Sequence, residues 1–326
     1  MRKENIYEEI QNDIMKANIS ENEKNKMLKN VMRLKEQKVN IMITGATGCG
    51  KSSTINAMFD TEVATVGVGV DPETMEIEKY ELDNLILWDT PGLGDGKEAD
   101  NRHAKNIIKK LAEVDEEGKA LIDLVLVILD GGTRDLGTSY ELINNVIIPN
   151  LGKEKENRIL VAINQADMAM KGRNWDYEKN EPNQTLISFL EDKVRSVQKR
   201  VYEATGVKIE PIYYSAGFKE EGGEQGRPYN LSKLLYYIVQ ATPSKKRVVY
   251  ANNINQNTEM WVDDDDLLDY GNETRLSIVD SIRESAYQGM EIGGAIGKVF
   301  GGFGETIGRV AGAVVGGVVS FITSLF

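Results

Sequence analysis

Residues 39–52 have the sequence VNIMITGATGCGKS, an apolar strand followed by a glycine loop of the form GxxxxGK[ST], and the next residues, STINAMF, have the pattern of the first turns of a helix. In such a loop the backbone N–H groups curl around an anion, the lysine reaches the β- and γ-phosphates, and the serine hydroxyl binds Mg²⁺. The helix N-terminus adds its own positive end. We therefore expect a nucleotide phosphate site formed by Gly45, Gly48, Cys49, Gly50, Lys51, Ser52 and Ser53.

The composition limits the classes to which the protein can belong. Its 326 residues leave room for one α/β domain with helical additions. The formal net charge of -12 argues against a protein that wraps a nucleic-acid backbone, so we do not expect nucleic acid as a partner. The single cysteine, Cys49, excludes an intramolecular disulfide and fits a reducing cytoplasm. Residues 1–5 open a polar stretch with no apolar signal-peptide core after it, so we expect a cytoplasmic location.

Four segments follow from the patterning: an N-terminal helical segment (1–37), a nucleotide-binding domain (38–243), an acidic linker and helix (244–288) and a glycine-rich hydrophobic tail (289–326). In the second segment apolar runs alternate with helical stretches, which predicts an α/β fold with a mostly parallel central sheet flanked by helices. Ligands of such sheets bind at the carboxyl ends of the strands. The expected strands are 41–44, 75–82, 85–89, 124–129, 159–164 and 209–214, and the expected helices begin near 51 and 138 and span 101–113, 186–204 and 231–240.

The segments on either side of this domain have helical patterns. Ile6, Ile10 and Ile14 recur at four-residue spacing, and the sequence SENE at 20–23 forms a capping box before a second helix. We expect these helices to pack on the main domain or on a C-terminal counterpart; a partly disordered charged lead-in is the alternative. After Pro243, residues 252–257 and the acidic run 263–266 have the composition of a solvated linker before a helix at about 273–288.

Further motifs stand at the ends of the later strands. Asp89 begins the sequence DTPG, in which a carboxylate can hold Mg²⁺ through water and the N–H of Gly92 can meet a γ-phosphate. That contact exists only with a triphosphate, so the segment after Gly92 is a natural switch. Residues 163–167, INQAD, close another strand, and residues 214–216, YSA, close the last.

These last two motifs predict a guanine site. The Asp167 carboxylate can accept both N–H groups of guanine, which adenine cannot offer. The Asn164 amide can connect the base-binding loop to the phosphate loop, and the Ala216 N–H can donate to the guanine oxygen. Gln165 and Ser215 complete the expected set of nucleotide-binding residues.

In these motifs residues 38–243 resemble the P-loop GTPases of the TRAFAC class, and specifically the Era-like bacterial and the immunity-related, dynamin-like branches. The stretches that carry the resemblance are GATGCGKSSTINAMF, DPETME, LILWDTPGLGDG, NQAD and YYSA. It implies a GTP-binding G domain that hydrolyses GTP to GDP with Mg²⁺. Lys51 and Thr74 then take catalytic roles, with Ser52, Thr74 and Asp89 as the metal ligands. Thr61 and Thr65 are alternatives to Thr74 as the switch threonine.

Three positions depart from the pattern of these families. Gln165 replaces a lysine whose stem packs over guanine, and Leu93 stands where Ras-type proteins carry a water-orienting glutamine. Gly48 replaces the asparagine of the potassium-activated relatives. The resemblance therefore implies slow intrinsic hydrolysis, unless an activating protein or a second copy in a homodimer completes the site.

Some residues near the motifs leave two interpretations open. His103 either approaches a phosphate or is a surface or packing residue, and the second is favoured. Cys49 is either a redox sensor or a small residue tolerated in the loop, and again the second is favoured. The stretch 168–177 is either an interaction loop anchored by Trp175 or a connection whose aromatic residues cover a helix.

The tail, residues 289–326, has glycines at mostly four-residue spacing from Gly293 to Gly316. This is the packing pattern of membrane helices, and in water each glycine costs a helix roughly 1 kcal/mol. The 17 uncharged residues 310–326 give about 25 Å of helix against a bilayer core of about 30 Å. We expect a peripheral or tail-anchored contact with lipid; a tail that packs on its own domain or in an oligomer interface is the alternative.

Three functions fit these features. The first is a GTP switch that its tail directs to a membrane or a partner. The second is a dynamin-like or immunity-related effector that remodels or perforates membranes. The third, a ribosome-assembly GTPase, fits less well because no basic RNA-binding module follows the G domain and the chain is acidic.

Overall fold

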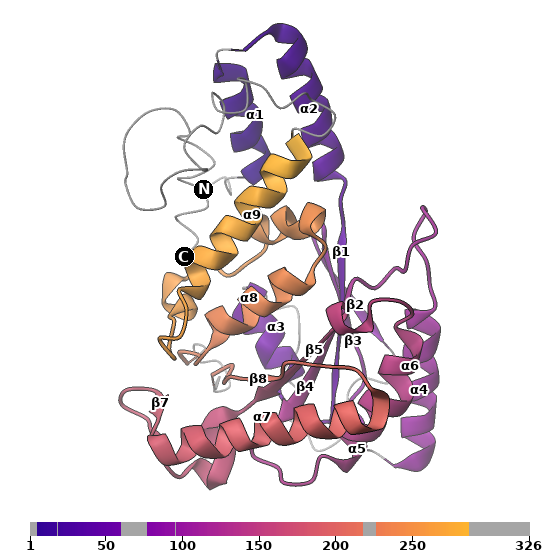
Figure 1. Cartoon of the computed structure of the whole chain (residues 1–326), viewed down its shortest axis with the longest axis vertical. Helices are drawn as coiled ribbons and strands as arrows, with labels where there is room; N and C mark the ends of the chain where they lie inside the picture. The colour runs from indigo at the N-terminus through magenta and orange to yellow at the C-terminus, as the bar shows by residue number, and fades with distance from the viewer. Residues whose placement is uncertain (1–4, 18, 60–76, 95, 218–225, 287–326) are drawn as a thin grey trace.

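A six-stranded sheet forms the centre of the computed structural model, which describes residues 5–17, 19–59, 77–94, 96–217 and 226–286 (Figure 1). The strand order is β2-β3-β1-β4-β5-β8, with β2 antiparallel to β3 and the other pairs parallel. This confirms the predicted α/β fold with a mostly parallel sheet. The strands are β1 (Val39–Gly45), β2 (Glu78–Leu82), β3 (Leu85–Asp89), β4 (Leu124–Asp130), β5 (Ile159–Asn164) and β8 (Ile212–Tyr213), and β6 (Trp175–Asp176) pairs with β7 (Glu181–Pro182) outside the sheet.

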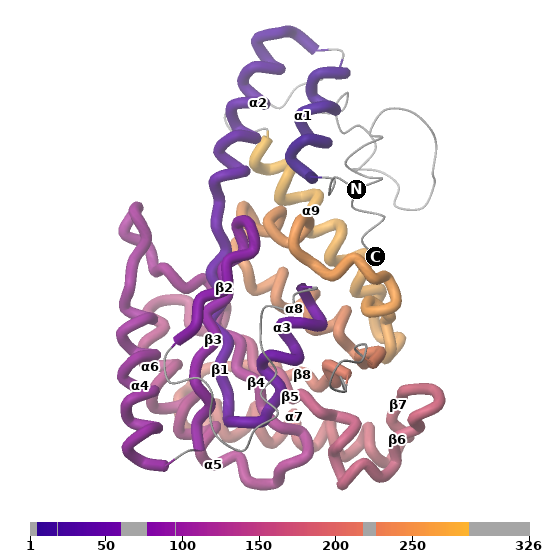
Figure 2. The backbone as a smooth tube through the Cα atoms, turned by 180° about the vertical axis from the view of Figure 1, so that it is seen from behind, coloured from indigo at the N-terminus to yellow at the C-terminus, as the bar shows by residue number. Residues whose placement is uncertain are grey.

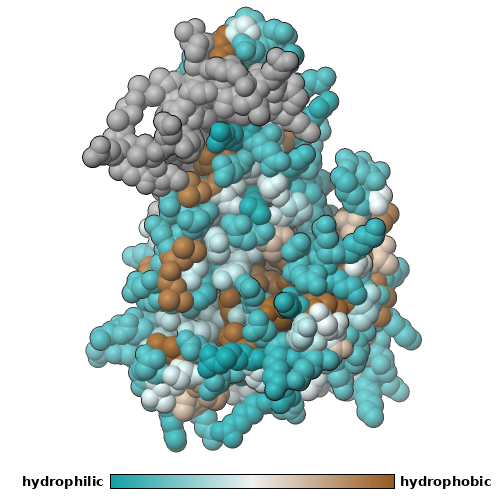
Figure 3. All heavy atoms as spheres, viewed as in Figure 1, coloured by the Kyte–Doolittle hydropathy of each residue, from teal (hydrophilic) through white to brown (hydrophobic). Residues whose placement is uncertain are grey.

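Helices cover both faces of this sheet, which explains why β1 and β5 are buried along their whole length. Because side chains alternate along a strand, Ile41 and Ile43 of β1 pack in one core and Met42 packs in the other. The first core lies under α3 (Lys51–Phe59) and α8 (Leu231–Ala241). The second lies under α4 (Lys97–Leu111) and α7 (Gln184–Thr205). On the face that Figure 3 shows, hydrophilic residues predominate and hydrophobic ones are scattered.

The expected helices are present with shifted ends. The one predicted after Thr138 is divided into α5 (Gly137–Glu141), a π-helical stretch (Leu142–Ile147) and α6 (Ile148–Asn150). Pro149 follows the π-helical stretch, and its ring would clash with the carbonyl four residues earlier in a regular α-helix. Short 3₁₀ segments span Lys155–Asn157, Ala166–Gly172, Ser244–Asn252 and Thr258–Trp261. No described helix is long and apolar enough to cross a bilayer; the tail lies outside the described residues.

The N-terminal helix α1 (Ile6–Lys16) packs against α2 (Glu21–Lys35), and α2 packs against the C-terminal helix α9 (Tyr270–Ala286), a C-terminal counterpart as predicted; Figures 1 and 2 show α2 and α9 side by side. The capping box is present, because the Ser20 hydroxyl accepts from the Glu23 N–H and the Glu23 carboxylate accepts from the Ser20 N–H. The Asn30 amide donates to the Ala286 carbonyl at 3.0 Å. The alternative of a disordered lead-in is therefore wrong for the described part of these helices.

The interpretation of 252–257 and 263–266 as solvated linker is wrong. Asn255 is only 7% exposed, and its side chain donates to the Ala57 carbonyl at 2.9 Å. Asp264 pairs with Arg227 at 2.9 Å, and Asp265 pairs with Lys233 at 2.5 Å. Buried polar groups are tolerated where they find such partners. The segment is therefore packed onto the domain, while the boundary at 243 stays a prediction.

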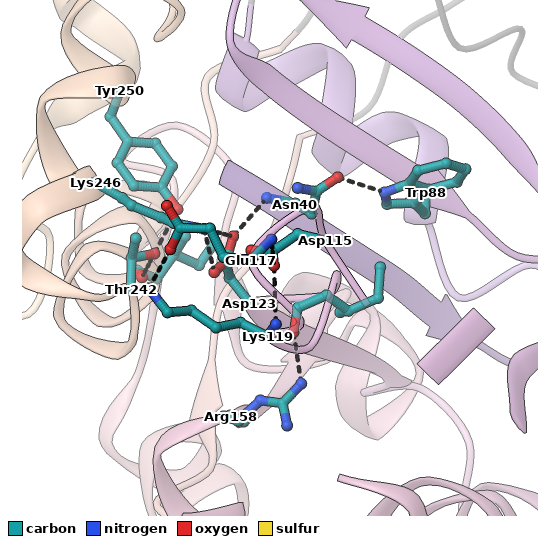
Figure 4. A network of polar contacts seen from close by, with 12 residues as sticks. Asn40, Trp88, Asp115, Glu117, Lys119, Asp123, Arg158, Thr242, Lys246 and Tyr250 are labelled. Atoms are coloured by element: carbon teal, nitrogen blue, oxygen red, sulfur yellow. Dashed lines mark hydrogen bonds and ion pairs between the residues drawn. The ribbon is translucent and has the colours of Figure 1, made fainter. Parts of the chain in front are cut away.

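The segment after Pro243 is also attached to the G domain near the amino end of β1, through Lys246 (Figure 4). Lys246 donates to both oxygens of Asp123 at 2.7 and 2.9 Å, and Asp123 also accepts from the Asn40 N–H. The Trp88 indole donates to the Asn40 side chain at 3.0 Å. Beside this network is a cavity of about 530 Å³, lined in part by Trp88 and Lys246. It lies toward the end of β1 opposite the phosphate loop, so it is not part of the predicted nucleotide site.

Candidate nucleotide site

The predicted loops meet at the carboxyl edge of the sheet because the parallel strands end in register. Asp89 pairs with Ile43 of β1, and Asn164 pairs with Asp130 of β4. The phosphate loop connects β1 to α3, so it leaves the same edge. The motifs, separated by more than 160 residues of sequence, therefore form one neighbourhood.

The phosphate loop is closely packed against the base-binding loop. Gly50 has a φ of 86°, in the region that favours glycine, and a Cβ there would lie 2.2 Å from the Asn164 amide nitrogen. Lys51 opens α3, and its Nζ lies 3.3 Å from the Ala46 carbonyl. The Lys51 side chain thus reaches back over the loop, where a phosphate would meet it. Ser52 and Ser53 follow in the first turn of the helix.

Two amide side chains hold the phosphate loop to the base-binding loop. Asn164 is buried, and its Nδ2 donates to the Cys49 carbonyl at 2.9 Å. Gln165 has a φ of 58°, and its Nε2 donates to the Gly48 carbonyl at 2.8 Å. The predicted connection by Asn164 is confirmed. Gln165 therefore makes the second half of an amide clamp, and its packing against a base stays a prediction.

The Asp167 carboxylate is oriented by Ser215, whose hydroxyl donates to Oδ1 at 2.6 Å. The backbone of Ser215 is fixed in turn by two hydrogen bonds with Tyr229. Ala216 was expected to donate its N–H to guanine; in the structure that N–H donates to the Asn164 Oδ1 at 3.0 Å. The contacts of these residues with a base stay predictions.

Of the residues predicted to hold magnesium, Asp89 has surroundings that fit such a ligand. Asp89 is buried, and its Oδ1 has no hydrogen-bond partner among the described residues. Burial raises the pKa of Asp89 to about 6, against the opposing effect of the Lys51 ammonium. A buried carboxylate oxygen without a partner fits a hard cation and its water shell. Ser52 is a second ligand candidate, and Thr74 lies outside the described residues, as do Thr61 and Thr65.

The start of the predicted switch lies against the phosphate loop. The Thr47 N–H donates to the Leu93 carbonyl at 3.2 Å, and the Leu93 N–H donates to the Gly45 carbonyl at 3.4 Å. Gly92 is required here, because a Cβ would lie 2.1 Å from the Thr47 hydroxyl. The Leu93 side chain is buried in the core beneath α4. This apolar, buried side chain offers no hydrogen bond to a water molecule.

Residues 40–165 match the family described as 50S ribosome-binding GTPase. The chain contains a P-loop GTPase domain. Translocase of chloroplast 125 from Physcomitrium patens is 37% identical over 103 residues, which are 30% of this chain and 9% of that protein. Interferon-inducible GTPase 1 from Mus musculus is 39% identical over 62 residues, 17% of this chain and 15% of that protein. The chain thus spans a small part of either relative.

Among solved structures, the crystal structure of Toc33 from Arabidopsis thaliana in complex with GDP and Mg²⁺ is similar. It has a TM-score of 0.44 and 17% identity, and the match covers 72% of this chain and 96% of that chain.

One residue near the G-domain motifs was not predicted from the sequence. Lys193 of α7 donates to the carbonyls of Asp130, Gly131 and Thr133 at 2.7 to 3.0 Å. It fixes the turn after β4, whose Gly131 N–H donates to the Asn164 carbonyl at 2.7 Å. A lysine in a charged helix carries no signal of such a contact. His103 is buried, as the favoured interpretation of a surface or packing residue allowed, and it also contacts the Gly92 carbonyl of the switch segment.

The stretch 168–177 of the G domain shows both of the alternative features. Trp175 is 7% exposed, and its ring packs edge-on against Tyr229 with centroids 5.2 Å apart. Trp175 is therefore a packing residue, as the second interpretation held. Tyr177 is 67% exposed and remains open for contact with a partner.

Cys49 is expected to resist alkylation in the folded G domain. Its side chain is 1% exposed, and burial raises the pKa of the thiol to about 11 despite the nearby Lys51. At pH 8 about one thiol in a thousand would then be ionised, against roughly a quarter in an unfolded chain. We expect a thiol reagent to react at least about a hundredfold more slowly with native than with urea-unfolded protein. Equal rates would restore the redox-sensor interpretation.

Proposed function

We propose that this G domain binds GTP and GDP with Mg²⁺, hydrolyses GTP to GDP slowly on its own, and acts as a switch. The amide clamp carries the proposal: Asn164 and Gln165 donate to two consecutive carbonyls of the phosphate loop, Cys49 and Gly48. A clamp of this kind keeps the phosphate site and the base site at a fixed separation. The predicted guanine reader, Asp167, lies two residues beyond Gln165 and is held by Ser215.

Each residue has a distinct part in this proposal. Lys51 and the N–H groups of the loop neutralise the phosphates, and Asp167 accepts the two N–H groups of guanine. Ser52, Asp89 and Thr74 would hold Mg²⁺, which neutralises charge on the β- and γ-phosphates when bound. The N–H of Gly92 donates to the γ-phosphate, and this contact orders the segment that follows.

The slow intrinsic rate follows from the switch segment. Leu93 is apolar and has its side chain buried beneath α4, so it cannot orient the attacking water. Gly48 offers no side chain that could hold a monovalent cation. We infer that an activating protein or a second copy of the chain supplies the missing group. A rate of phosphate release per molecule that rises with protein concentration would favour the second copy.

Calorimetry with GTP, GDP and ATP in the presence of Mg²⁺ tests the proposal. We expect both guanine nucleotides to bind at least about a hundredfold more tightly than ATP, because two hydrogen bonds to a carboxylate contribute roughly 1.5–3 kcal/mol each. Equal binding of ATP, or no binding of either guanine nucleotide, would remove the proposal.

The tail, residues 289–326, is proposed to bring the G domain to a lipid surface. Its glycine spacing and its 17 uncharged final residues support this. We expect the full-length protein to co-sediment with anionic liposomes more strongly with GTP than with GDP, and the protein ending at residue 288 not to co-sediment. Equal sedimentation of the two proteins would instead support a tail that packs on protein.

A second candidate is a dynamin-like or immunity-related effector that remodels or perforates membranes. It is favoured by the packing of α2 against α9, which places helices from both ends of the chain beside the G domain. GTP-dependent leakage of liposomes together with self-assembly would support it. A ribosomal role is suggested by the description of the matched family, but the net charge of -12 disfavours contact with RNA.

A further inference from the structure

Two side chains of α4 bracket the segment that follows β3. The Asp100 Oδ1 accepts from the Gly94 N–H at 2.9 Å, and the His103 Nδ1 donates to the Gly92 carbonyl at 3.2 Å. The two residues are three apart on a helix, so they lie on the same side of it. Leu93 lies between the two held groups. We call Asp100 and His103 the switch clamp.

Of the two residues of the switch clamp, His103 costs the fold more free energy, because within the described part of the chain it buries an unpaired polar atom. It is 2% exposed, and its Nε2 is buried without a hydrogen-bond partner among the described residues. An apolar side chain would fill the same space without leaving a polar atom unpaired. The contribution specific to a histidine here is therefore its single bond to Gly92.

That bond fixes one peptide group from both ends. The carbonyl of the Gly92–Leu93 peptide accepts from His103, and its N–H donates to the Gly45 carbonyl at 3.4 Å. On the other side, the close contact of Gly92 with Thr47 leaves no room for a side chain. The backbone at Gly92 thus has its orientation set by α4 and by the phosphate loop together.

We propose that His103 is a positioning residue for the triphosphate state: by holding the Gly92 carbonyl, it aims the N–H of Gly92 at the γ-phosphate position. This rests on the proposed binding of GTP. His103 acts through Gly92 and contacts no nucleotide itself. GDP lacks the phosphate that this N–H would meet, so the bond favours GTP over GDP.

Two variants and a control test this role. His103→Leu removes the donor, whereas His103→Asn keeps an N–H at about the position of Nδ1. Ile107→Val shortens a fully buried side chain one turn along α4 and removes no hydrogen-bond donor. For each protein, calorimetry gives the Kd of GDP and of a non-hydrolysable GTP analogue, and hydrogen exchange of the nucleotide-free protein gives the protection of the amides at 92–94.

We expect His103→Leu to weaken the GTP analogue by tenfold or more while the Kd of GDP changes less than twofold. His103→Asn should recover most of that loss, and Ile107→Val should leave the ratio of the two constants unchanged. Exchange at 92–94 should be faster only in His103→Leu. Equal weakening of both nucleotides, no rescue by asparagine, or unchanged exchange would overturn the inference.

The results distinguish an error in the proposed function from an error in the role given to the switch clamp. If the wild-type protein bound neither nucleotide, the proposed function would be wrong. The exchange at 92–94 in His103→Leu would then test only whether His103 holds the backbone of the switch segment. Wild-type protein that binds both nucleotides, with no selective loss in His103→Leu, would leave the function intact and remove the role of His103.

Discussion

Replacing Lys51 by methionine is expected to lower the affinity for GTP by at least about a hundredfold and the affinity for GDP by at least about tenfold. The Nζ of Lys51 lies 3.3 Å from the Ala46 carbonyl, and this ammonium is a cation at the centre of the phosphate loop. Hydrogen bonds to charged groups contribute roughly 1.5–3 kcal/mol each; GTP would lose one at each of two phosphates, and GDP, which lacks the γ-phosphate, would lose one. Since about 1.4 kcal/mol is a tenfold change, the loss is about two to four orders of magnitude for GTP and about one to two for GDP.

Methionine keeps the length and the apolar stem of lysine, so the change tests charge rather than packing. Lys51 also opposes the effect of burial on the pKa of Asp89, so its loss favours protonated Asp89 and weakens a magnesium site as well. Lys199→Met is the matched control, because Lys199 lies on the exposed side of α7 and its side chain is 74% exposed. Calorimetry gives the affinities, and thermal unfolding shows whether both variants are folded. Unchanged GDP affinity in Lys51→Met would contradict the assignment of the loop.

The fold and the loops could be predicted because their signals are local. The strand that ends at Thr44 and the glycine pattern up to Ser52 are contiguous, and the short apolar runs define the other strands. The meeting of the motifs followed from one rule, that parallel strands end at the same edge. Residues 41–44, 85–89 and 159–164 were predicted as strands, and the structure extends or matches each of them.

The errors concern contacts between residues far apart in the sequence. Asn255 and Asp264 belong to a stretch whose composition is typical of solvated linkers, but their partners, Ala57 and Arg227, are supplied by the folded domain. For His103 the favoured interpretation included packing and the side chain is buried, but nothing in the sequence indicated its hydrogen bond to the Gly92 carbonyl. Composition predicts only the average exposure of a residue type. The exposure of an individual residue depends on its tertiary contacts.

Replacing Asp167 by asparagine is expected to convert the site from guanine to xanthine nucleotides. A carboxylate only accepts hydrogen bonds, which suits the two adjacent N–H donors of guanine. Asparagine would offer one acceptor and one NH₂ donor, so one guanine donor would face another donor. Xanthine carries a carbonyl oxygen in place of the guanine amino group and can accept from that NH₂.

Ser215 decides which way the new amide points. Its hydroxyl donates to the Asp167 Oδ1 at 2.6 Å, and in the variant it would keep the amide oxygen on its own side and turn the NH₂ toward the base. The affinity for GDP should fall by about a hundredfold or more, since a hydrogen bond to a charged group is lost and a base donor is left unpaired. The affinity for XDP should rise above that for GDP, whereas Asp192→Asn, on a side chain that is 74% exposed in α7, should change neither. Calorimetry with both diphosphates measures the ratio, and an equal loss for GDP and XDP would mean that Asp167 holds the loop rather than reads the base.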